Sequence, residues 1–356
     1  PVCGVSEGGV AVRVLFLVEP VAETMGSERV VRATKKWLER EGVEVGIVDP
    51  RWDPPEWVFE GADVVHFFNS GSSCVASWKL LKRLTGVPIV VTVTYWPPMA
   101  GELRMAKEEM GLDVEDAGFL VQARAVKDTM LFRIAELADG LIFTSPREAQ
   151  QFLKTAEAFN FEMRGRRCYV SNAVDPEEIS GVSMEKEAGL VSTVGRVEVA
   201  KNQWMVIKAM RWLVKEFPEL RYVCVGRDLL GLGKKVSERF VEFRGEVEPR
   251  EAMRVLGRSE VHVLASFRDT PGLASLEAAA LGCKLVVSDD PFGTARDYFP
   301  EYLVSFVDPL SEVDLYRGIK EQLLSEPDPA LRELVLERYT YPVVVKRLIE
   351  VYNQVR

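Results

Sequence analysis

Two carboxylates flank a turn and a helix in the segment SFRDTPGLASLEAAALGCKLVVS (266–288). Asp269 lies in a predicted loop, and Glu277 follows eight residues later on a helix predicted over 273–281. Because the turn at 271–272 leads directly into this helix, the first backbone N–H groups of the helix lack partners. Together with the helix dipole, these groups form a site for an anion such as a phosphate.

The two acids of this segment point to sugar hydroxyls as ligands. A phosphate repels a nearby carboxylate, so Asp269 and Glu277 are better suited to accept hydrogen bonds from hydroxyl groups than to touch the phosphate. The alternative is structural: Asp269 is an acid of a surface loop, and Glu277 complements the positive N-terminus of its helix. The local sequence leaves both interpretations open.

Two cations occupy a comparable position earlier in the chain, in GRVEVAKNQWMVIKAM. Arg196 follows a strand predicted over 190–195, and Lys201 begins the next helix. The helix macrodipole opposes a cation there by about 0.3–1 kcal/mol, whereas a bound anion reverses the sign of that interaction. The fork of Arg and the point charge of Lys both suit a diphosphate. A solvated surface pair is the alternative.

Apolar runs separated by helical segments predict the scaffold that positions these side chains. In the first half, strands are expected at 12–18, 43–48, 62–68, 87–94, 140–144 and 168–171. The pattern then restarts, with strands expected at 190–195, 222–226, 241–245, 261–265, 284–287 and 303–307. Strands that alternate with helices and are apolar throughout indicate parallel sheets covered on both faces. The predicted fold class is α/β, with two doubly wound, Rossmann-like domains.

A polar connector, VSNAVDPEEISGVSMEKEAG, separates the two halves. We expect an N-terminal domain over residues 1–173 and a C-terminal domain over 174–341, with their strand ends facing each other across a central cleft. The last helix, over 342–356, is expected to begin at Pro342, because Pro fits a first helical position. Its apolar stripe must pack on another element and consists of Val345, Leu348, Ile349 and Tyr352.

The composition describes a globular chain and excludes several classes of protein. With 356 residues and 47% hydrophobic content, the chain is long enough for two cores. No apolar run reaches the roughly 18 residues of a membrane span, so at most peripheral membrane contact is expected. No signal peptide pattern is recognisable. The net charge of -9 argues against nucleic acid as a partner.

The cysteines are too widely spaced for a zinc site or a disulfide framework, since no C-x-x-C pair occurs. They are Cys3, Cys74, Cys168, Cys224 and Cys283. This usage predicts a reducing, cytoplasmic environment and no structural metal. Asn and Gln are scarce relative to Glu, Lys and Arg, which is typical of a thermophilic source.

Three motifs carry a resemblance to a known family. They are G-R-x-x-x-x-K-N (Gly195–Asn202), the acid-x7-Glu element from Asp269 to Glu277 with EAAALGCKLVVSD, and VSNAVD (Val170–Asp175). With the DVVH and TVTY segments of the first half, the chain resembles the retaining glycosyltransferases of family four, the group that includes glycogen synthase and phosphatidylinositol mannosyltransferase. The resemblance covers nearly the whole chain and is more specific in the second half. It implies the two-domain GT-B fold, with the last helix returning to the first domain.

The resemblance also implies roles for individual residues. In the family, the residues matching Arg196 and Lys201 bind the diphosphate of a nucleotide sugar, and the one matching Glu277 holds the ribose hydroxyls. The acid matching Asp269 contacts the donor sugar, which makes Asp269, with the two cations, the expected catalytic set. Backbone N–H groups for the distal phosphate are expected from Gly272, Leu273 and Ala274.

Three positions depart from the usual residues of the family. Asp269 stands where the family usually has Glu, which shortens its reach by at most roughly 1.5 Å. Tyr95 stands where a His often contacts the donor sugar, and Met25-Gly26 replaces the usual Gly-Gly of the first loop. Tyr95 and Gly26 are still expected at the donor. Candidates for a sugar or acceptor pocket are His66, Trp96 and Asn172, with a structural role as the alternative for His66 and packing as the alternative for Trp96.

The predicted activity is transfer of a hexose from a UDP- or GDP-sugar to an unidentified sugar, glycan or lipid acceptor, with retention of configuration. Negative charge develops on the leaving oxygen as the glycosidic bond breaks, and Arg196, Lys201 and the helix N-terminus would stabilise it. No cofactor and no obligatory metal are expected. Two alternatives remain: a nucleotide-sugar epimerase of the same fold, and a catalytically silent sugar-nucleotide-binding protein, which the residues Asp269 and Tyr95 favour.

Overall fold

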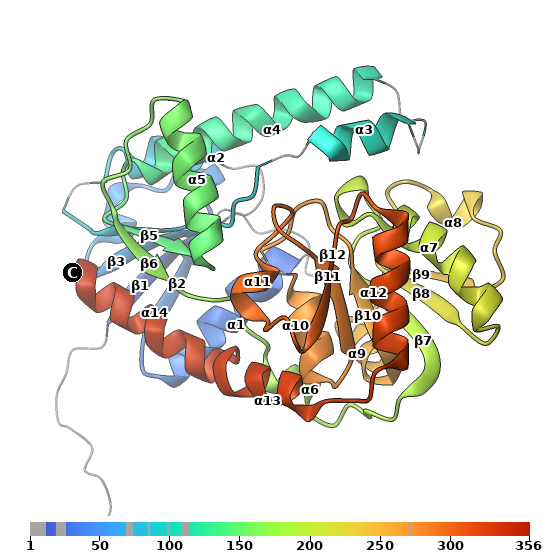
Figure 1. Cartoon of the computed structure of the whole chain (residues 1–356). Coiled ribbons are helices and arrows are strands. Elements are labelled where there is room, and N and C mark those ends of the chain that lie inside the picture. Colours follow the sequence, from blue (N-terminus) through green and yellow to red (C-terminus); the bar gives the residue numbers. More distant parts are fainter. Residues whose placement is uncertain are drawn as a thin grey trace, which may run out of the picture.

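The computed structural model describes residues 12–18, 26–68, 74–84, 86–97, 100–108, 111, 114–270 and 272–356. Within these residues the chain forms two parallel sheets of six strands each (Figure 1). The first sheet contains β1 (Arg13–Leu17), β2 (Glu44–Val48), β3 (Val64–Phe68), β4 (Ile89–Thr92), β5 (Gly140–Phe143) and β6 (Arg166–Tyr169). The second contains β7 (Glu187–Val194), β8 (Arg221–Val225), β9 (Val241–Gly245), β10 (Ser259–Leu264), β11 (Lys284–Ser288) and β12 (Val304–Val307). The α/β fold class with two similar halves is confirmed.

Helices surround both sheets (Figure 1). Before the connector they are α1 (Gly26–Arg40), η1 (Pro50–Trp52), η2 (Glu56–Phe59), α2 (Cys74–Leu81), α3 (Ala100–Glu108), α4 (Val114–Ala135) and α5 (Pro146–Ala158). After it they are α6 (Pro176–Ile179), η3 (Val199–Lys201), α7 (Gln203–Glu216), α8 (Leu232–Lys235), α9 (Pro249–Arg258), α10 (Leu273–Ala280), α11 (Ala295–Tyr298), α12 (Glu312–Leu324), α13 (Pro329–Arg338) and α14 (Tyr341–Val355). We call β1–β6 with α1–α5 and α14 the N-terminal half, and β7–β12 with α7–α13 the C-terminal half.

The strand order locates the position at which each sheet is suited to bind a ligand. The second sheet has the order β12-β11-β10-β7-β8-β9, so the direction of winding reverses between β7 and β10. Doubly wound sheets bind ligands at the carboxyl ends of the strands on either side of such a reversal. In the first sheet, ordered β2-β1-β3-β4-β5-β6, the reversal lies between β1 and β3. The segments that follow these two strands, 19–25 and 69–73, lie outside the described residues, and Met25 is among them.

Strands that are apolar on both faces explain why each sheet has two cores. All five residues of β3 are buried. In the second sheet, Val261 and Val263 of β10 join the core under α7 and α12. Leu285 and Val287 of β11 join the opposite core, under α9 and α10. Each such side chain contributes about 1.5–3 kcal/mol when fully buried, so the strand ends that carry the candidate site are rigidly anchored.

The last helix returns to the N-terminal half, as expected. Figure 1 shows α14 running from α13 in the C-terminal half across to the first sheet. It begins at Tyr341, so Pro342 is its second residue rather than its first. Three of the four expected stripe residues are buried and Ile349 is partly buried, all in one core with residues of α1, β1 and β2. The apolar stripe therefore docks the last helix on the N-terminal half.

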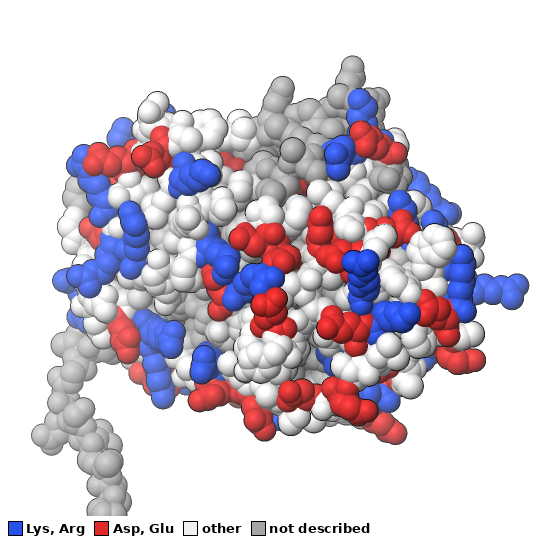
Figure 2. Space-filling model, viewed as in Figure 1, with Lys and Arg blue, Asp and Glu red and all other residues white. Residues whose placement is uncertain are grey.

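The surface mixes both signs of charge. Figure 2 shows Lys and Arg interspersed with Asp and Glu over the face seen in Figure 1. None of the described helices is both long and apolar enough to cross a membrane.

Candidate functional site

Lys201 and Asp269 meet where the second sheet reverses direction. Lys201 ends η3, after β7, and Asp269 lies in the loop after β10. The Lys201 Nζ donates to Asp269 Oδ2 at 2.5 Å, and both side chains are largely buried. A backbone hydrogen bond of 2.8 Å from Phe267 N to Ala200 O ties the two loops together. Thus the structure brings together two residues expected at the donor, one of each charge.

Asn202 fixes the direction in which Lys201 leaves the sheet. Its backbone is left-handed, with φ 57°, a conformation that Asn tolerates better than most residues. The side chain is fully buried and donates to Ala265 O at 3.1 Å and to Pro309 O at 2.8 Å. The sequence included Asn202 in a motif but assigned it no role. The Lys-Asn pair at a helix start was the available signal.

The N-terminus of α10 faces the same pair. Gly272 precedes the helix, and a Cβ on it would lie 2.5 Å from Leu264 Cδ2 and 3.2 Å from Asp269 Oδ2, so the close approach favours glycine. Within the described residues, the N–H groups of Leu273 and Ala274 make no hydrogen bond. Pro271, the other residue of the expected turn, lies outside the described residues. The free N–H groups are suited to an anion.

Ser275 adds an unsatisfied hydroxyl in the first turn of α10. It is buried, and its Oγ has no hydrogen-bond partner in the described part of the chain. Thr294, at the start of α11, is likewise buried with a free Oγ1 among these residues, and its N–H donates to Asp269 O at 3.1 Å. Buried polar atoms normally find a partner, which can be a water or a ligand.

Glu277 is buried and already has a partner. The Arg29 guanidinium of α1 donates to Glu277 Oε1 at 2.7 Å and also to Glu178 of α6. Burial raises the pKa of the Glu277 carboxyl, and the Arg29 charge lowers it. Sequence reasoning missed Arg29. The available signal was a cation three residues after Gly26, in the first turn of a helix whose dipole opposes it.

Arg196 is not part of this cluster. Its side chain is 52% exposed and pairs with Glu198 at 3.1 Å, and no contact joins it to Lys201 or Asp269 among the described residues. It follows Gly195, where the backbones of β7 and β8 converge. A Cβ on Gly226 would lie 2.2 Å from Gly195 O, so only glycine fits there. The close strand ends fix the Arg196 backbone and leave its side chain free to turn.

His66 belongs to the core, which corrects its expected place in a sugar or acceptor pocket. It is fully buried in β3, with Nδ1 2.7 Å from the Tyr352 hydroxyl and Nε2 2.7 Å from Thr92 Oγ1. Burial lowers the pKa of His66 to about 3, so the ring is neutral. The structure therefore supports a structural role for His66. His262 in β10 is also fully buried.

Tyr95 does not present its ring to a donor. The side chain is 1% exposed and packs against Phe132 and Phe152, with ring centroids 5.8 and 5.4 Å away. Its expected donor contact is therefore corrected to a packing role. Trp96 is buried too, and its Nε1 donates to Pro291 O of the other half at 3.2 Å. Gly26 begins α1.

Asn172 joins the two halves next to the Asp269 loop. Its Nδ2 donates to Thr270 O at 2.5 Å, and its backbone N–H donates to the Tyr298 hydroxyl at 3.0 Å. The same hydroxyl donates to Thr144 O at 2.9 Å. Asn172 thus fastens the loop that holds Asp269 to the end of the first sheet.

Glu148 is a buried carboxylate that sequence reasoning did not single out. It accepts hydrogen bonds from the N–H groups of Tyr95, at 2.6 Å, and Thr144, at 2.5 Å, and from the Thr144 hydroxyl, at 2.7 Å. Burial raises the pKa of Glu148 to about 7, against the effect of these donors. Ser145 caps α5, and Glu148 stands three residues later, the spacing of a capping box. That spacing was the signal in the sequence.

Helix α3 reaches from the N-terminal half onto the candidate site. Figure 1 shows α3 lying over the C-terminal half. Met105 is buried in the same core as Val197 and Phe267, which flank the Lys201 loop and the Asp269 loop. Glu102 pairs with Arg268 Nε at 3.2 Å. The site is therefore covered by the other half.

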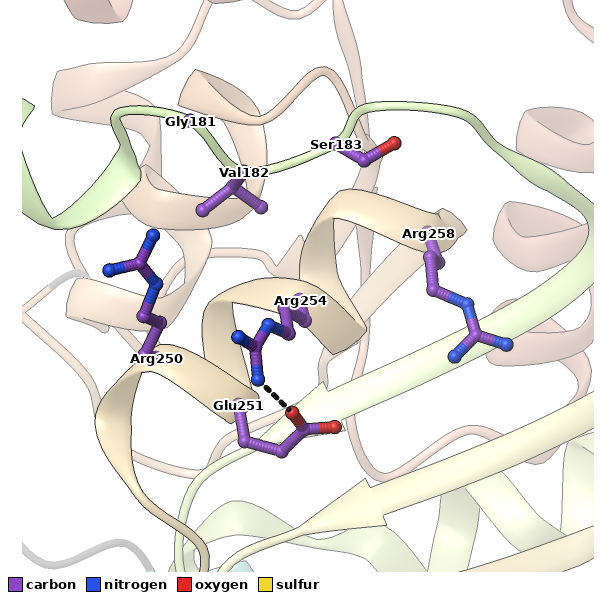
Figure 3. Close-up of a pocket in the computed structure, with 7 residues that line it drawn as sticks. All are labelled: Gly181, Val182, Ser183, Arg250, Glu251, Arg254 and Arg258. Atoms are coloured by element: carbon purple, nitrogen blue, oxygen red, sulfur yellow. Dashed lines mark hydrogen bonds and ion pairs between the residues drawn. The ribbon is translucent and has the colours of Figure 1, made fainter.

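A separate hollow of about 320 Å³ lies beside α9, away from this cluster. Figure 3 shows the side chains of Arg250, Arg254 and Arg258 along it. Arg254 is already paired with Glu251 at 3.0 Å and Arg258 with Glu187. Because two of these three arginines are already paired with carboxylates, the hollow is a weaker anion site than the start of α10. In the part of the chain that is described, no group of His, Cys, Asp and Glu is arranged to hold a metal ion.

A comparison with known protein families finds a match in the C-terminal half. Residues 188–309 match the family described as "Glycosyl transferases group 1". This stretch contains Lys201, Asp269, Glu277 and the N-terminus of α10. No curated protein matches the chain in sequence.

Solved structures share the whole architecture. A sucrose-phosphate synthase from Thermosynechococcus elongatus is similar over 97% of this chain and 99% of its own, with a TM-score of 0.69 and 17% identity. A glycosyltransferase from Rickettsia africae is similar over 97% and 98%, with a TM-score of 0.65 and 13% identity. The N-terminal domain of a trehalose-6-phosphate phosphatase from Candida albicans matches over 98% of both chains, with a TM-score of 0.67 and 11% identity. At these identities the similarity shows the fold, which is the two-domain GT-B arrangement.

Proposed function

We propose that this protein is a retaining glycosyltransferase that transfers a hexose from a nucleotide diphosphate sugar to an acceptor. The observation that carries the proposal is the Lys201–Asp269 pair beside the free N–H groups of α10. It lies at the reversal of the second sheet, in the segment that matches the group 1 glycosyltransferases. A cation, a helix N-terminus and a carboxylate in one place suit a diphosphate joined to a sugar.

In this proposal the C-terminal domain, residues 174–341, binds the donor. The diphosphate takes the place of Asp269 as the partner of Lys201 and lies against the N–H groups of Leu273 and Ala274. Arg196, half exposed and paired with Glu198, turns to the same diphosphate. The N-terminal domain, residues 1–173 with 342–356, supplies the acceptor side.

The proposed chemistry is charge stabilisation in a covered site. As the bond between the sugar and the diphosphate breaks, the electron pair stays on the leaving oxygen. Lys201, Arg196 and the N-terminus of α10 stabilise that charge without reorganisation. Asp269, released from Lys201, faces the sugar as positive charge develops on it. The acceptor hydroxyl attacks from the face that the diphosphate leaves and passes its proton to the departing diphosphate oxygen, so configuration is retained.

A thermal-shift screen with UDP-glucose, GDP-mannose and ADP-glucose tests the proposal first. A ligand present at 100 times its dissociation constant stabilises the folded chain by about 2.7 kcal/mol, a readily measured shift. The best ligand is then incubated with sugar, glycan and lipid acceptors, and the products are identified by NMR. Transfer or slow donor hydrolysis supports a glycosyltransferase. Release of an epimerised nucleotide sugar, or binding without any turnover, would replace it with one of the two alternative activities.

A further inference from the structure

Arg29 enters the nucleotide site of the proposed function from the other half of the molecule. It lies on α1, and its NH2 group donates to Glu277 Oε1 of α10 at 2.7 Å and to Glu178 of α6. The Arg29 side chain is 21% exposed and that of Glu277 is 7% exposed. A guanidinium from the N-terminal half thus contacts the carboxylate expected to hold the ribose.

Its placement is unfavourable for α1 alone. A cation in the first turn of a helix is opposed by the macrodipole, and the buried Arg29 Nε has no partner among the described residues. The two carboxylates are what hold the side chain there. These carboxylates belong to α10 and to the connector. The contacts of Arg29 therefore contribute to the candidate site rather than to the stability of α1.

We propose that Arg29 is a positioning residue that keeps the Glu277 carboxylate ionised and oriented for the ribose, an inference that rests on the proposed function. Arg29 uses Oε1, and no other hydrogen bond to this carboxylate occurs in the described residues. Oε2 is therefore left for the ribose hydroxyls. A protonated Glu277 is a poor acceptor of hydrogen bonds from a diol. The positive charge of Arg29 therefore supports ribose binding by keeping Glu277 ionised, although Arg29 itself does not bind the ribose.

The charged groups around Glu277 determine its protonation. Burial raises the pKa of the Glu277 carboxyl, Arg29 of α1 lowers it, and the Glu178 carboxylate of α6 raises it. Tyr341 of α14 lies near Arg29, and burial raises the pKa of its hydroxyl, so Tyr341 stays neutral over the pH range of the test. Since binding needs the ionised form, affinity falls as the pH drops through the Glu277 pKa. Loss of Arg29 shifts this decrease in affinity to higher pH, and loss of the Glu178 charge shifts the decrease to lower pH.

The test is nucleotide-sugar affinity measured by calorimetry from pH 5 to pH 8.5. The probe is whichever of UDP-glucose, GDP-mannose and ADP-glucose binds the wild type most tightly. These probes are diphosphate diesters, so they lack the phosphate group that titrates near pH 6. For Arg29→Met, binding weakens about tenfold for each pH unit below the raised pKa. Glu178→Gln shifts the pH dependence of the affinity to lower pH. Arg29→Lys keeps the positive charge and is expected to show the wild-type pH dependence.

Arg40→Met is the matched control, because Arg40 of α1 also forms an ion pair across the connector, with Glu177 at 2.5 Å. It is expected to leave the pH profile unchanged. A substitution that only loosens the contact between the halves would weaken binding equally at every pH. If Arg29→Met has this effect, the positioning role is wrong, while the proposed function stands. A wild type that binds none of the three probes overturns both.

Discussion

A chain that ends at Thr340 is expected to lose cooperative folding of its N-terminal half. This truncation removes α14, whose Tyr341, Val344, Val345, Leu348, Val351 and Tyr352 are buried against the first sheet and α1. Each fully buried apolar side chain contributes about 1.5–3 kcal/mol, and domains are stable by only about 5–15 kcal/mol. The Tyr352 hydroxyl is also lost, which leaves His66 Nδ1 buried without its partner at 2.7 Å. Thermal unfolding followed by circular dichroism and limited proteolysis measures the loss.

Two point variants test whether stability depends on the packing of α14 against the N-terminal half. Leu348→Ala empties a buried position and is expected to cost about 2–5 kcal/mol of unfolding free energy. Arg347→Ala changes the adjacent, exposed position and is expected to stay within about 0.5 kcal/mol of the wild type. Equal stabilities for the two variants, or an unchanged melting temperature for the truncated chain, would show that α14 is only appended to the fold.

Lys201→Ala and Asp269→Ala are expected to differ in their effect on nucleotide diphosphate binding. Lys201→Ala removes a charge-assisted contact worth about 1.5–3 kcal/mol, which is roughly a tenfold to hundredfold loss of affinity. Asp269→Ala frees Lys201 from its 2.5 Å partner, so affinity is kept or increased, while transfer falls because the acid beside the sugar is gone. Calorimetric titration and one transfer assay give both values.

Lys320→Ala is the control for these variants. Lys320 forms an ion pair with Glu216 at the same distance, 2.5 Å, on the exposed surface of α12. Its loss should leave nucleotide affinity and transfer unchanged. If Lys201→Ala binds nucleotide diphosphate as tightly as Lys320→Ala does, the diphosphate does not bind at the reversal of the second sheet.

Much of the scaffold was predictable because it depends on patterns within single segments. Apolar runs located the strands of both sheets, and the stripe of the last helix predicted its return. The neighbourhood of Lys201 and Asp269 also followed from the sequence. Each residue lies at the carboxyl end of a strand, and a doubly wound sheet brings the ends of its central strands together.

The partners of individual side chains were not predictable in this way. Tyr95 and Trp96 are amphipathic, so their types fit a ligand pocket and a packed interface equally well, and only the surrounding aromatic rings decide for Tyr95. Arg29 and Glu277 are separated by 248 residues. Their contact depends on how the two halves dock, which no local spacing encodes. The same holds for α3 over the site, since Met105 packs in the core of the other half.

A crystal structure with the nucleotide diphosphate that gives the largest thermal shift tests the central claim most directly. We expect the diphosphate to lie against the N–H groups of Leu273 and Ala274, with Lys201 turned from Asp269 to the phosphate oxygens. We also expect the ribose hydroxyls to bind Glu277 Oε2, while Arg29 still contacts Oε1. A nucleotide bound in the hollow beside α9, with the Lys201–Asp269 pair intact, would contradict the account.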